Sequence, residues 1–355
     1  MAFVLNEKLR GMKAYEPIEG SYRIRLDANE SFILPDDELE DAISEAVNTL
    51  AFNRYPDSAA AKLCSLAAEF YGVKAENVTA GNGSDELIGL ILSAFLQKGD
   101  KVISFSHDFS MYSFYAHLVE ADLIEIEKNA DFTVDFDKVS KIANEEKARI
   151  IIFSNPCNPT SLGVDSKTIE KLIKSVNALV VLDEAYMDFF GDSLSSKIDD
   201  FDNLIVLRTM SKAMGMAGIR MGFALANKML SDIIKTVKSP YNVNSVSQII
   251  ACEVFSRPEF IKQSINKIIS SRDDLTAQFK ALEEKHPEGL SLIGCAANFI
   301  FAKASRASDL YEFLKSRGVV IRLFGSYVRI TAGKNFENAE LIGLVDEFYG
   351  QGEDK

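Results

Sequence analysis

The sequence predicts an α/β protein with a large, mostly parallel mixed sheet flanked by helices, followed by a smaller α/β domain. Short runs that are apolar on both faces alternate with helical patterns, as in buried parallel strands. After about residue 240 the pattern changes to longer helices and a second set of strands. The length of 355 residues also suits two cores, because single cores usually stop growing near ~250–300 residues.

The expected elements follow from the spacing of apolar residues. Helices are expected at 36–50 and 58–71, and Ser84-Asp85-Glu86 is expected to cap a third helix that ends near Gln97. The apolar runs that we expect to be strands of the large sheet are 102–105, 123–126, 150–153, 179–182, 204–207 and 222–226.

Beyond residue 240, the expected helices are 245–256, 258–284, 307–317 and 336–349, and the expected strands are 298–302, 319–322 and 328–331. We therefore expect a large domain at 31–245 and a small C-terminal domain at 246–355. Residues 1–30 show little periodicity, and we expect an arm that packs on the small domain or on a dimer partner.

Charge and composition argue against several classes of function. The chain has 52 acidic and 39 basic side chains, a net charge of −13, and polyanions such as nucleic acids or anionic membranes need a basic patch. The N-terminus lacks the pattern of a signal peptide and no apolar run approaches ~20 residues, so we expect a cytosolic protein. Four separated cysteines and three histidines argue against disulfides, a metal site and a histidine base.

Two turns carry ligand-binding patterns. Residues 80–86 read A-G-N-G-S-D-E before a helix, where glycines and free N–H groups suit a phosphate, although a plain helix cap is an equal alternative. Residues 155–160 read N-P-C-N-P-T after a strand, which indicates an ordered turn and places an asparagine at the carboxyl end of the sheet.

Two charged residues also follow expected strands. Asp183 ends an apolar strand, and a buried carboxylate needs a cationic partner unless it is a solvated loop residue. Lys212 lies in a glycine-bearing loop with Arg220, where desolvation would lower its pKa and make the amine nucleophilic. One ligand for all four motifs must be anionic at one end, cationic at another and electrophilic, as pyridoxal 5′-phosphate (PLP) is.

The order G-N-G-S-D-E, N-P-x-N-P-T, D-E-A-Y and S-K-x₇-R resembles that of the fold-type I PLP-dependent aminotransferases. Over nearly the whole chain the sequence looks most similar to the histidinol-phosphate aminotransferases, with supporting matches at 26–30, 53–57 and 327–331. The resemblance implies a ping-pong transaminase of histidine biosynthesis that converts histidinol phosphate and 2-oxoglutarate to imidazole acetol phosphate and glutamate.

The resemblance also implies roles for single residues. Lys212 matches the lysine that forms a Schiff base (aldimine) with PLP and then transfers the proton, which fits the scarcity of histidine. Asp183 matches the partner of the ring nitrogen, and Tyr186 and Asn158 match the partners of the phenolic oxygen. The residues that match phosphate ligands or the ring-stacking aromatic are Gly83, Ser84, Asp85, Thr209, Ser211, Arg220 and Phe109.

On the substrate side, Arg329 matches the arginine that holds the glutamate carboxylate. Tyr55 matches a tyrosine that reaches the cofactor phosphate of the neighbouring subunit, so the resemblance implies a homodimer. Arg322, Tyr15 and Asn29 match secondary substrate contacts. We expect Tyr241 and Asn242 to line the entrance of the site.

Three departures from the family pattern leave the substrate open. Residues 107–109 read H-D-F where P-T-Y is common, Ser161 stands where a glycine usually follows Thr160, and residues 26–32 lack the frequent N-P ending. The alternatives are an aromatic or other amino-acid aminotransferase and a PLP-dependent decarboxylase of the phosphothreonine type.

Overall fold

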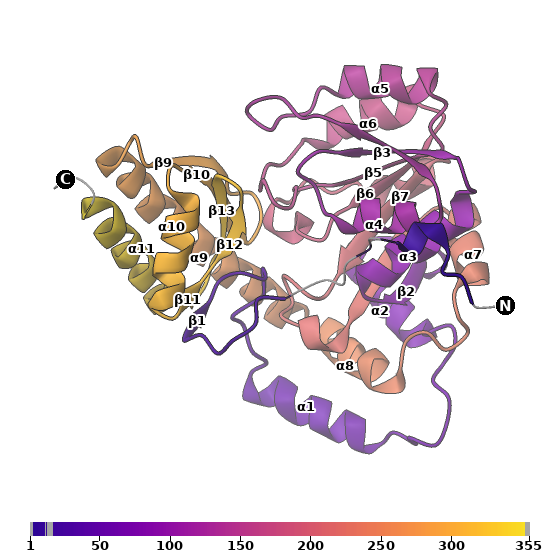
Figure 1. Cartoon of the computed structure of the whole chain (residues 1–355). Coiled ribbons are helices and arrows are strands. Elements are labelled where there is room, and N and C mark those ends of the chain that lie inside the picture. The colour runs from indigo at the N-terminus through magenta and orange to yellow at the C-terminus, as the bar shows by residue number, and fades with distance from the viewer. Residues whose placement is uncertain (1–2, 11, 13–16, 352–355) are drawn as a thin grey trace.

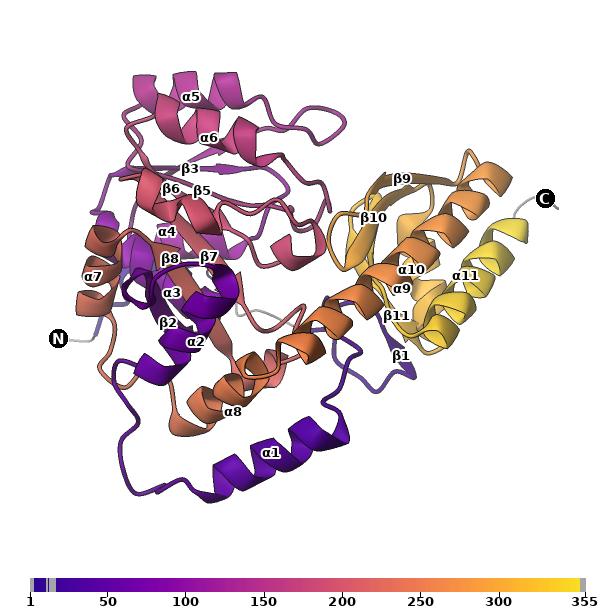
Figure 2. The same ribbon diagram turned by 180° about the vertical axis from the view of Figure 1, so that it is seen from behind.

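The computed structural model describes residues 3–10, 12 and 17–351. In this part of the chain a seven-stranded sheet and a four-stranded sheet form two bodies, and the four-stranded sheet lies to one side of the larger one (Figure 1). Figure 2 shows a long helix that runs from the larger body to the smaller one.

The seven-stranded sheet has the order β2-β8-β7-β6-β5-β3-β4. Strand β8 is antiparallel to β2 and β7, and the other neighbours are parallel. This mixed, mostly parallel sheet confirms the predicted fold class. Its strands are β2 (Val78–Asn82), β3 (Lys101–Phe105), β4 (Asp122–Ile126), β5 (Ile150–Ser154), β6 (Leu179–Asp183), β7 (Leu204–Thr209) and β8 (Met221–Ala226).

Helices cover both faces of this sheet, which explains why its strands are continuously apolar. Along β6, Val180 and Leu182 face one core cluster and Val181 faces another. One face is covered by α3 (Gly83–Phe95), α4 (Met111–Leu118) and α7 (Lys228–Val237). The other face is covered by α2 (Ala61–Tyr71), α5 (Phe136–Glu145), α6 (Ser166–Ser175) and α8 (Ser245–Phe255), with α1 (Asp37–Asn48) packed on α8.

The four-stranded sheet is antiparallel, has the order β12-β13-β10-β9 and encloses a core of its own. The strands of this sheet are β9 (Leu290–Gly294), β10 (Phe299–Ala304), β12 (Arg322–Phe324) and β13 (Tyr327–Thr331). The helices of the same body are α9 (Pro258–Lys285), α10 (Ala307–Ser316) and α11 (Asn335–Gly350). The strand β1 (Ile24–Arg25) pairs with β11 (Val319–Val320), so Ile24 and Leu26 pack in this core.

Three details differ from the expected elements. The segment expected as one strand at 319–322 is divided into β11 and β12. The boundary expected at residue 245 precedes α8, whose Ala251 packs in the core of the seven-stranded sheet. Helix α9 contacts both cores, through Ile261 and Leu275 respectively, and is therefore the connection between the two bodies.

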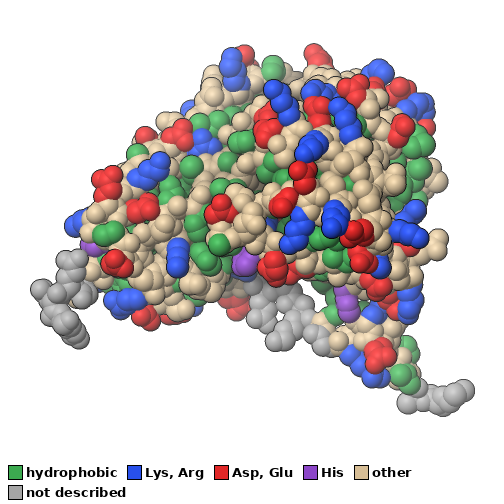
Figure 3. Space-filling view, turned by 90° about the horizontal axis from the view of Figure 1, so that it is seen from above, with side chains coloured by type: hydrophobic (Ala, Val, Ile, Leu, Met, Phe, Trp, Pro, Cys, Tyr) green, Lys and Arg blue, Asp and Glu red, His purple; other side chains and the backbone are tan. Residues whose placement is uncertain are grey.

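The surface carries acidic and basic side chains side by side. The face seen in Figure 3 has no continuous basic field, in keeping with the net charge of −13. None of the helices in the described part of the chain is long and apolar enough to cross a membrane.

Candidate active site

A cavity of about 420 Å³ lies where the two bodies meet. Ser154, Asp183 and Thr209, at the carboxyl ends of β5, β6 and β7, line one side. Arg322 on β12 and Arg329 on β13 line the other side. A cavity at the carboxyl ends of parallel strands is the usual ligand site of an α/β sheet.

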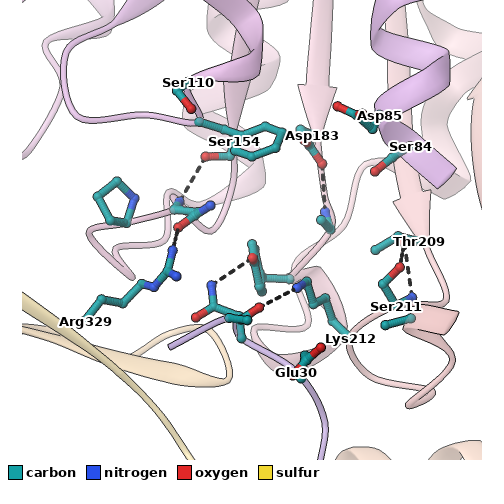
Figure 4. A pocket seen from close by; sticks show the side chains of 18 of the residues that line it. Glu30, Ser84, Asp85, Ser110, Ser154, Asp183, Thr209, Ser211, Lys212 and Arg329 are labelled. Atoms are coloured by element: carbon teal, nitrogen blue, oxygen red, sulfur yellow. Dashed lines mark hydrogen bonds between the residues drawn. The ribbon is translucent and has the colours of Figure 1, made fainter. Parts of the chain in front are cut away.

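Most of the predicted site residues line this cavity, although they come from distant parts of the chain (Figure 4). They are Asn29, Ser84, Asp85, Phe109, Asn158, Asp183, Tyr186, Thr209, Ser211, Lys212, Arg220, Arg322 and Arg329. Gly83 adjoins it, because a Cβ there would lie 2.8 Å from Nη2 of Arg220.

Three predicted residues have other positions. The rings of Tyr55 and Tyr241 stack on each other with centroids 4.5 Å apart, outside the cavity lining, and Tyr55 is 80% exposed. Asn242 donates to the Glu86 carboxylate at 2.9 Å and is likewise outside the lining. Tyr15 lies outside the described residues.

Lys212 is the nucleophile candidate of the cavity. It follows β7 in a loop whose neighbouring Ala213 and Met214 are fully buried, and its Nζ donates to the carbonyl of Ala28 at 3.3 Å. Desolvation, assisted by the positive charge of Arg329, lowers the pKa of Lys212 to about 8. About a tenth of the amine is therefore neutral at pH 7, which makes it available for attack on a carbonyl.

Asp183 is buried at the end of β6. Its carboxylate accepts hydrogen bonds from Oη of Tyr112 at 2.8 Å and from N of Ala185 at 3.1 Å. Burial outweighs these bonds and raises the pKa of Asp183 to about 6. Within the part of the chain that the structure describes, no lysine or arginine forms an ion pair with Asp183. A cationic ligand group in the cavity would therefore satisfy this carboxylate.

The first turn of α3 and the end of β7 form a cradle for an anion. Thr209 and Ser211 are joined by a bond between their hydroxyls at 3.0 Å, and the Arg220 guanidinium approaches the helix start at Gly83. Gly83 has φ +83°, and any side chain there would meet the guanidinium. The free N–H groups of a helix start and an arginine together suit a phosphate.

The start of α3 differs from the expected cap. The helix begins at Gly83 with Asn82 as the N-cap residue, and the Glu86 carboxylate accepts the hydrogen bond of the Asn82 N–H at 2.6 Å. Ser84 therefore does not cap the helix, and its side chain lies at the cavity beside Asp85 (Figure 4).

Arg329 is held in place from both bodies. Its Nη2 donates to the carbonyl of Asp27 at 2.6 Å, and its Nη1 donates to Oδ1 of Asn158. Phe299 and Phe324 lie with their ring centroids 5.4 and 5.5 Å from Cζ. On the neighbouring wall, Nδ2 of Asn29 donates to Oη of Tyr186 at 3.0 Å.

Several cavity residues were not predicted. Asp108 accepts a hydrogen bond from N of Phe109 at 2.8 Å and another from the Ser154 hydroxyl, which itself accepts from N of Asn158 at 3.1 Å. These bonds tie the Phe109 loop to the Asn158 turn. Asp108 and Ser154 follow or end strands in the same way as Asp183, and that pattern could have revealed them. The other such residues are Asp27, Ala28, Glu30, Ser110, Pro159, Ala185, Ala217 and Phe324.

The Asp183→Asn substitution should stabilise the cofactor-free protein in a pH-dependent way. A carboxyl with a pKa of about 6 when folded and about 3.9 when unfolded destabilises the folded chain above pH 6, and the effect fades as the pH falls toward 4. We expect the variant to raise Tm by about 2–4 °C at pH 8 and by about half as much at pH 5.

Thermal scans at both pH values, with the exposed Asp274→Asn as control, measure this difference. An equal gain at pH 5 and pH 8 would contradict the explanation, because it would show that the titration of Asp183 does not cause the stabilisation.

Comparison with known proteins agrees with this geometry. The family model described as "Aminotransferase class I and II" matches residues 23–345. The histidinol-phosphate aminotransferase of Clostridium novyi (strain NT) is 38% identical over 347 residues, which are 96% of this chain and 96% of that protein. These matches confirm the family that the sequence motifs predicted.

Solved structures extend the comparison to the fold. The histidinol-phosphate aminotransferase from Sinorhizobium meliloti in complex with pyridoxal-5′-phosphate has a TM-score of 0.84 at 21% identity, over 93% of this chain and 92% of that one. The L-threonine-O-3-phosphate decarboxylase from Porphyromonas gingivalis has a TM-score of 0.78 at 22% identity, over 92% and 99%. From the family model and the curated relatives, we conclude that the chain belongs to the class I and II aminotransferase family.

Proposed function

We propose that the chain is a PLP-dependent histidinol-phosphate aminotransferase, which converts histidinol phosphate and 2-oxoglutarate to imidazole acetol phosphate and glutamate. The observation that carries the proposal is one cavity that holds a lysine of lowered pKa, a buried carboxylate, an anion cradle and two arginines. Relatives of that name, 36–38% identical over nearly the whole chain, favour this activity over decarboxylation.

The residues of the cavity fit PLP. The cradle formed by the start of α3, Thr209, Ser211 and Arg220 suits the phosphate, and Asp183 offers a carboxylate to a protonated ring nitrogen. Phe109 offers an aromatic wall, and Lys212 offers an amine to the aldehyde. When bound, PLP supplies the electron sink for breaking a bond at the substrate carbon.

The side chains of the protein then have distinct tasks. Because its pKa is about 8, Nζ of Lys212 can both accept and return a proton near neutral pH. Asp183 would favour the protonated form of a facing ring nitrogen, since no lysine or arginine among the described residues forms a salt bridge with its buried carboxylate. The Tyr186 hydroxyl accepts a hydrogen bond from Asn29, which orients it to donate its own proton to the phenolic oxygen of PLP. The transfer of a proton thus needs no histidine.

Two arginines suit the anionic group of the substrate. Arg322 and Arg329 are partners in the register of β12 and β13, and directly opposed residues of antiparallel strands point to the same face of a sheet. Both line the cavity. Paired guanidinium groups can bind a carboxylate or a phosphate with parallel hydrogen bonds, which suits glutamate and histidinol phosphate in turn.

The active unit that we propose is a homodimer in which Tyr55 reaches the neighbouring site. Tyr55 is 80% exposed and stacks on Tyr241, which is 47% exposed, so two aromatic rings face outward on the surface. Phe52 and Leu34, also exposed, add apolar surface of the kind that dimer interfaces bury. The cytosolic location stays a prediction.

A panel of amino donors tests the proposed function. Histidinol phosphate, phenylalanine and phosphothreonine are each supplied with 2-oxoglutarate, and both glutamate and carbon dioxide are measured. We expect glutamate from histidinol phosphate with a kcat/KM at least about tenfold above that of phenylalanine, because a phosphate gains charged hydrogen bonds that a benzyl group lacks. Carbon dioxide from phosphothreonine, or a preference for phenylalanine, would contradict the proposal.

A further inference from the structure

The turn that carries Asn158 ends at a residue in an unfavourable backbone conformation. Ser161 has φ +54°, in the left-handed region where a side chain with a Cβ is disfavoured, and it is 1% exposed. A glycine would adopt this conformation without strain. The serine side chain must therefore contribute something that the turn would otherwise lack.

The Ser161 hydroxyl joins the two bodies of the protein. Its Oγ donates to the carbonyl of Phe299 at 2.9 Å and accepts from N of Ala297, also at 2.9 Å. The carbonyl of Ser161 accepts from N of Ala296 at 2.8 Å. A Cβ on Gly294 would lie 2.2 Å from the carbonyl oxygen of Thr160, so the backbones are already in contact here.

This contact is coupled to the cavity through two short connections. Asn158, three residues before Ser161, accepts the hydrogen bond of Arg329. Phe299, whose carbonyl accepts the hydrogen bond of Ser161, lies on β10 next to β13. The Phe299 ring contacts the Tyr186 ring with centroids 5.2 Å apart, and the centroid of the Phe299 ring is 5.4 Å from Cζ of Arg329. The turn is thus attached to the four-stranded sheet at two points.

We propose that Ser161 is a positioning residue that sets the place of Arg329 relative to Asn158, and through it the affinity of the cavity for anionic substrates. Removal of the hydroxyl leaves the Ala297 N–H and the Phe299 carbonyl buried without this partner. The turn is then attached to the sheet less firmly, through the bond between the Ser161 carbonyl and the Ala296 N–H, and the place of Asn158 relative to Arg329 is less well fixed. The cofactor cradle lies on the other body and stays intact.

The test uses succinate, a dicarboxylate that has neither an amino nor a keto group and therefore binds without reacting. Its Kd is measured by calorimetry on the PLP-loaded protein for wild type, Ser161→Ala and Ser161→Gly. The Ala variant removes the hydroxyl and keeps the strained conformation, whereas the Gly variant removes both. The matched control is Ser231→Ala, which removes a buried hydroxyl that donates to the carbonyls of Asn77 and Ala226 within the larger body.

We expect both Ser161 variants to weaken succinate binding about tenfold, with unchanged PLP affinity. Ser231→Ala should change neither value, although it also removes a buried hydroxyl, whose proton is shared between two main-chain carbonyls. Hydrogen exchange at residues 296–301 should rise in the Ser161 variants alone. If Ser161→Ala does not fold, Ser161→Gly still tests the role of the hydroxyl, because glycine adopts the positive φ without strain and the variant should fold.

Two results would overturn the inference: wild-type succinate affinity in Ser161→Gly, or an equal loss of affinity in Ser231→Ala. The inference rests on the proposed function in one respect, namely that the substrates are anions. A wild type that binds succinate but does not transaminate histidinol phosphate would refute the proposed substrate, while the same binding comparison would still decide the role of Ser161.

Discussion

The Lys212→Ala variant is expected to lose about 10⁴-fold or more of kcat with any amino donor. The substitution removes the amine that we propose as both the nucleophile and the proton carrier of the cavity, whose pKa is lowered to about 8. None of the three histidines lines the cavity, so no imidazole can take over the proton transfer. Lys212→Arg should lose as much, because a guanidinium keeps the charge but stays protonated.

The loss must be separable from a loss of cofactor. The cradle at the start of α3 and at Thr209 and Ser211 does not use Lys212, so the variant should still retain PLP without a covalent link. Borohydride reduction followed by peptide mapping should attach the cofactor to the Lys212 peptide in wild type and to no peptide in the variant. The exposed Lys228→Ala serves as control. Activity within tenfold of wild type would contradict the role of Lys212.

Local sequence patterns were sufficient to predict much of the fold. The central strands are buried on both faces, and this burial appears in the sequence as runs such as Leu-Val-Val-Leu before Asp183. The motif residues that follow those strands lie near one another because the carboxyl ends of parallel strands meet at one edge. The shared edge explains why Asn158, Asp183 and Lys212 line one cavity.

Other features depend on contacts between distant segments and leave no local signal. Strand β2 has the composition Val-Thr-Ala-Gly-Asn, and it becomes a strand because it pairs with β8 far along the chain. Tyr112 lies on α4 as one of several aromatic residues, and only the packing of α4 on the sheet turns its hydroxyl to Asp183. The interdomain bonds of Ser161 likewise require the position of β10.

The cavity is divided between the two bodies in a way that separates its tasks. The residues that we propose as cofactor contacts come from the seven-stranded sheet and its loops, whereas Arg322 and Arg329 come from the four-stranded sheet. A change in the smaller body should therefore alter substrate affinity and leave cofactor binding unaffected. Arg329 offers the sharpest case, because its guanidinium is the cavity cation that bonds to both Asn158 and the Asp27 carbonyl.

The Arg329→Ala variant is expected to lower kcat/KM for glutamate about 10²–10³-fold while PLP affinity stays within about twofold. Loss of the guanidinium leaves a substrate carboxylate without its charged partner. The site is largely shielded from water, since Arg329 is only 8% exposed. Arg329→Lys restores the charge but not the planar fork, so we expect it to recover only part of the loss.

Steady-state kinetics with glutamate and a PLP titration of each variant measure the two effects separately. The control is Arg317→Ala, which removes an arginine of the same body that pairs with Glu347 at the surface. Equal kcat/KM for glutamate in wild type and Arg329→Ala would exclude Arg329 as the carboxylate partner. Full recovery in Arg329→Lys would show that charge alone suffices, and the bidentate geometry inferred from the paired strands β12 and β13 would then be wrong.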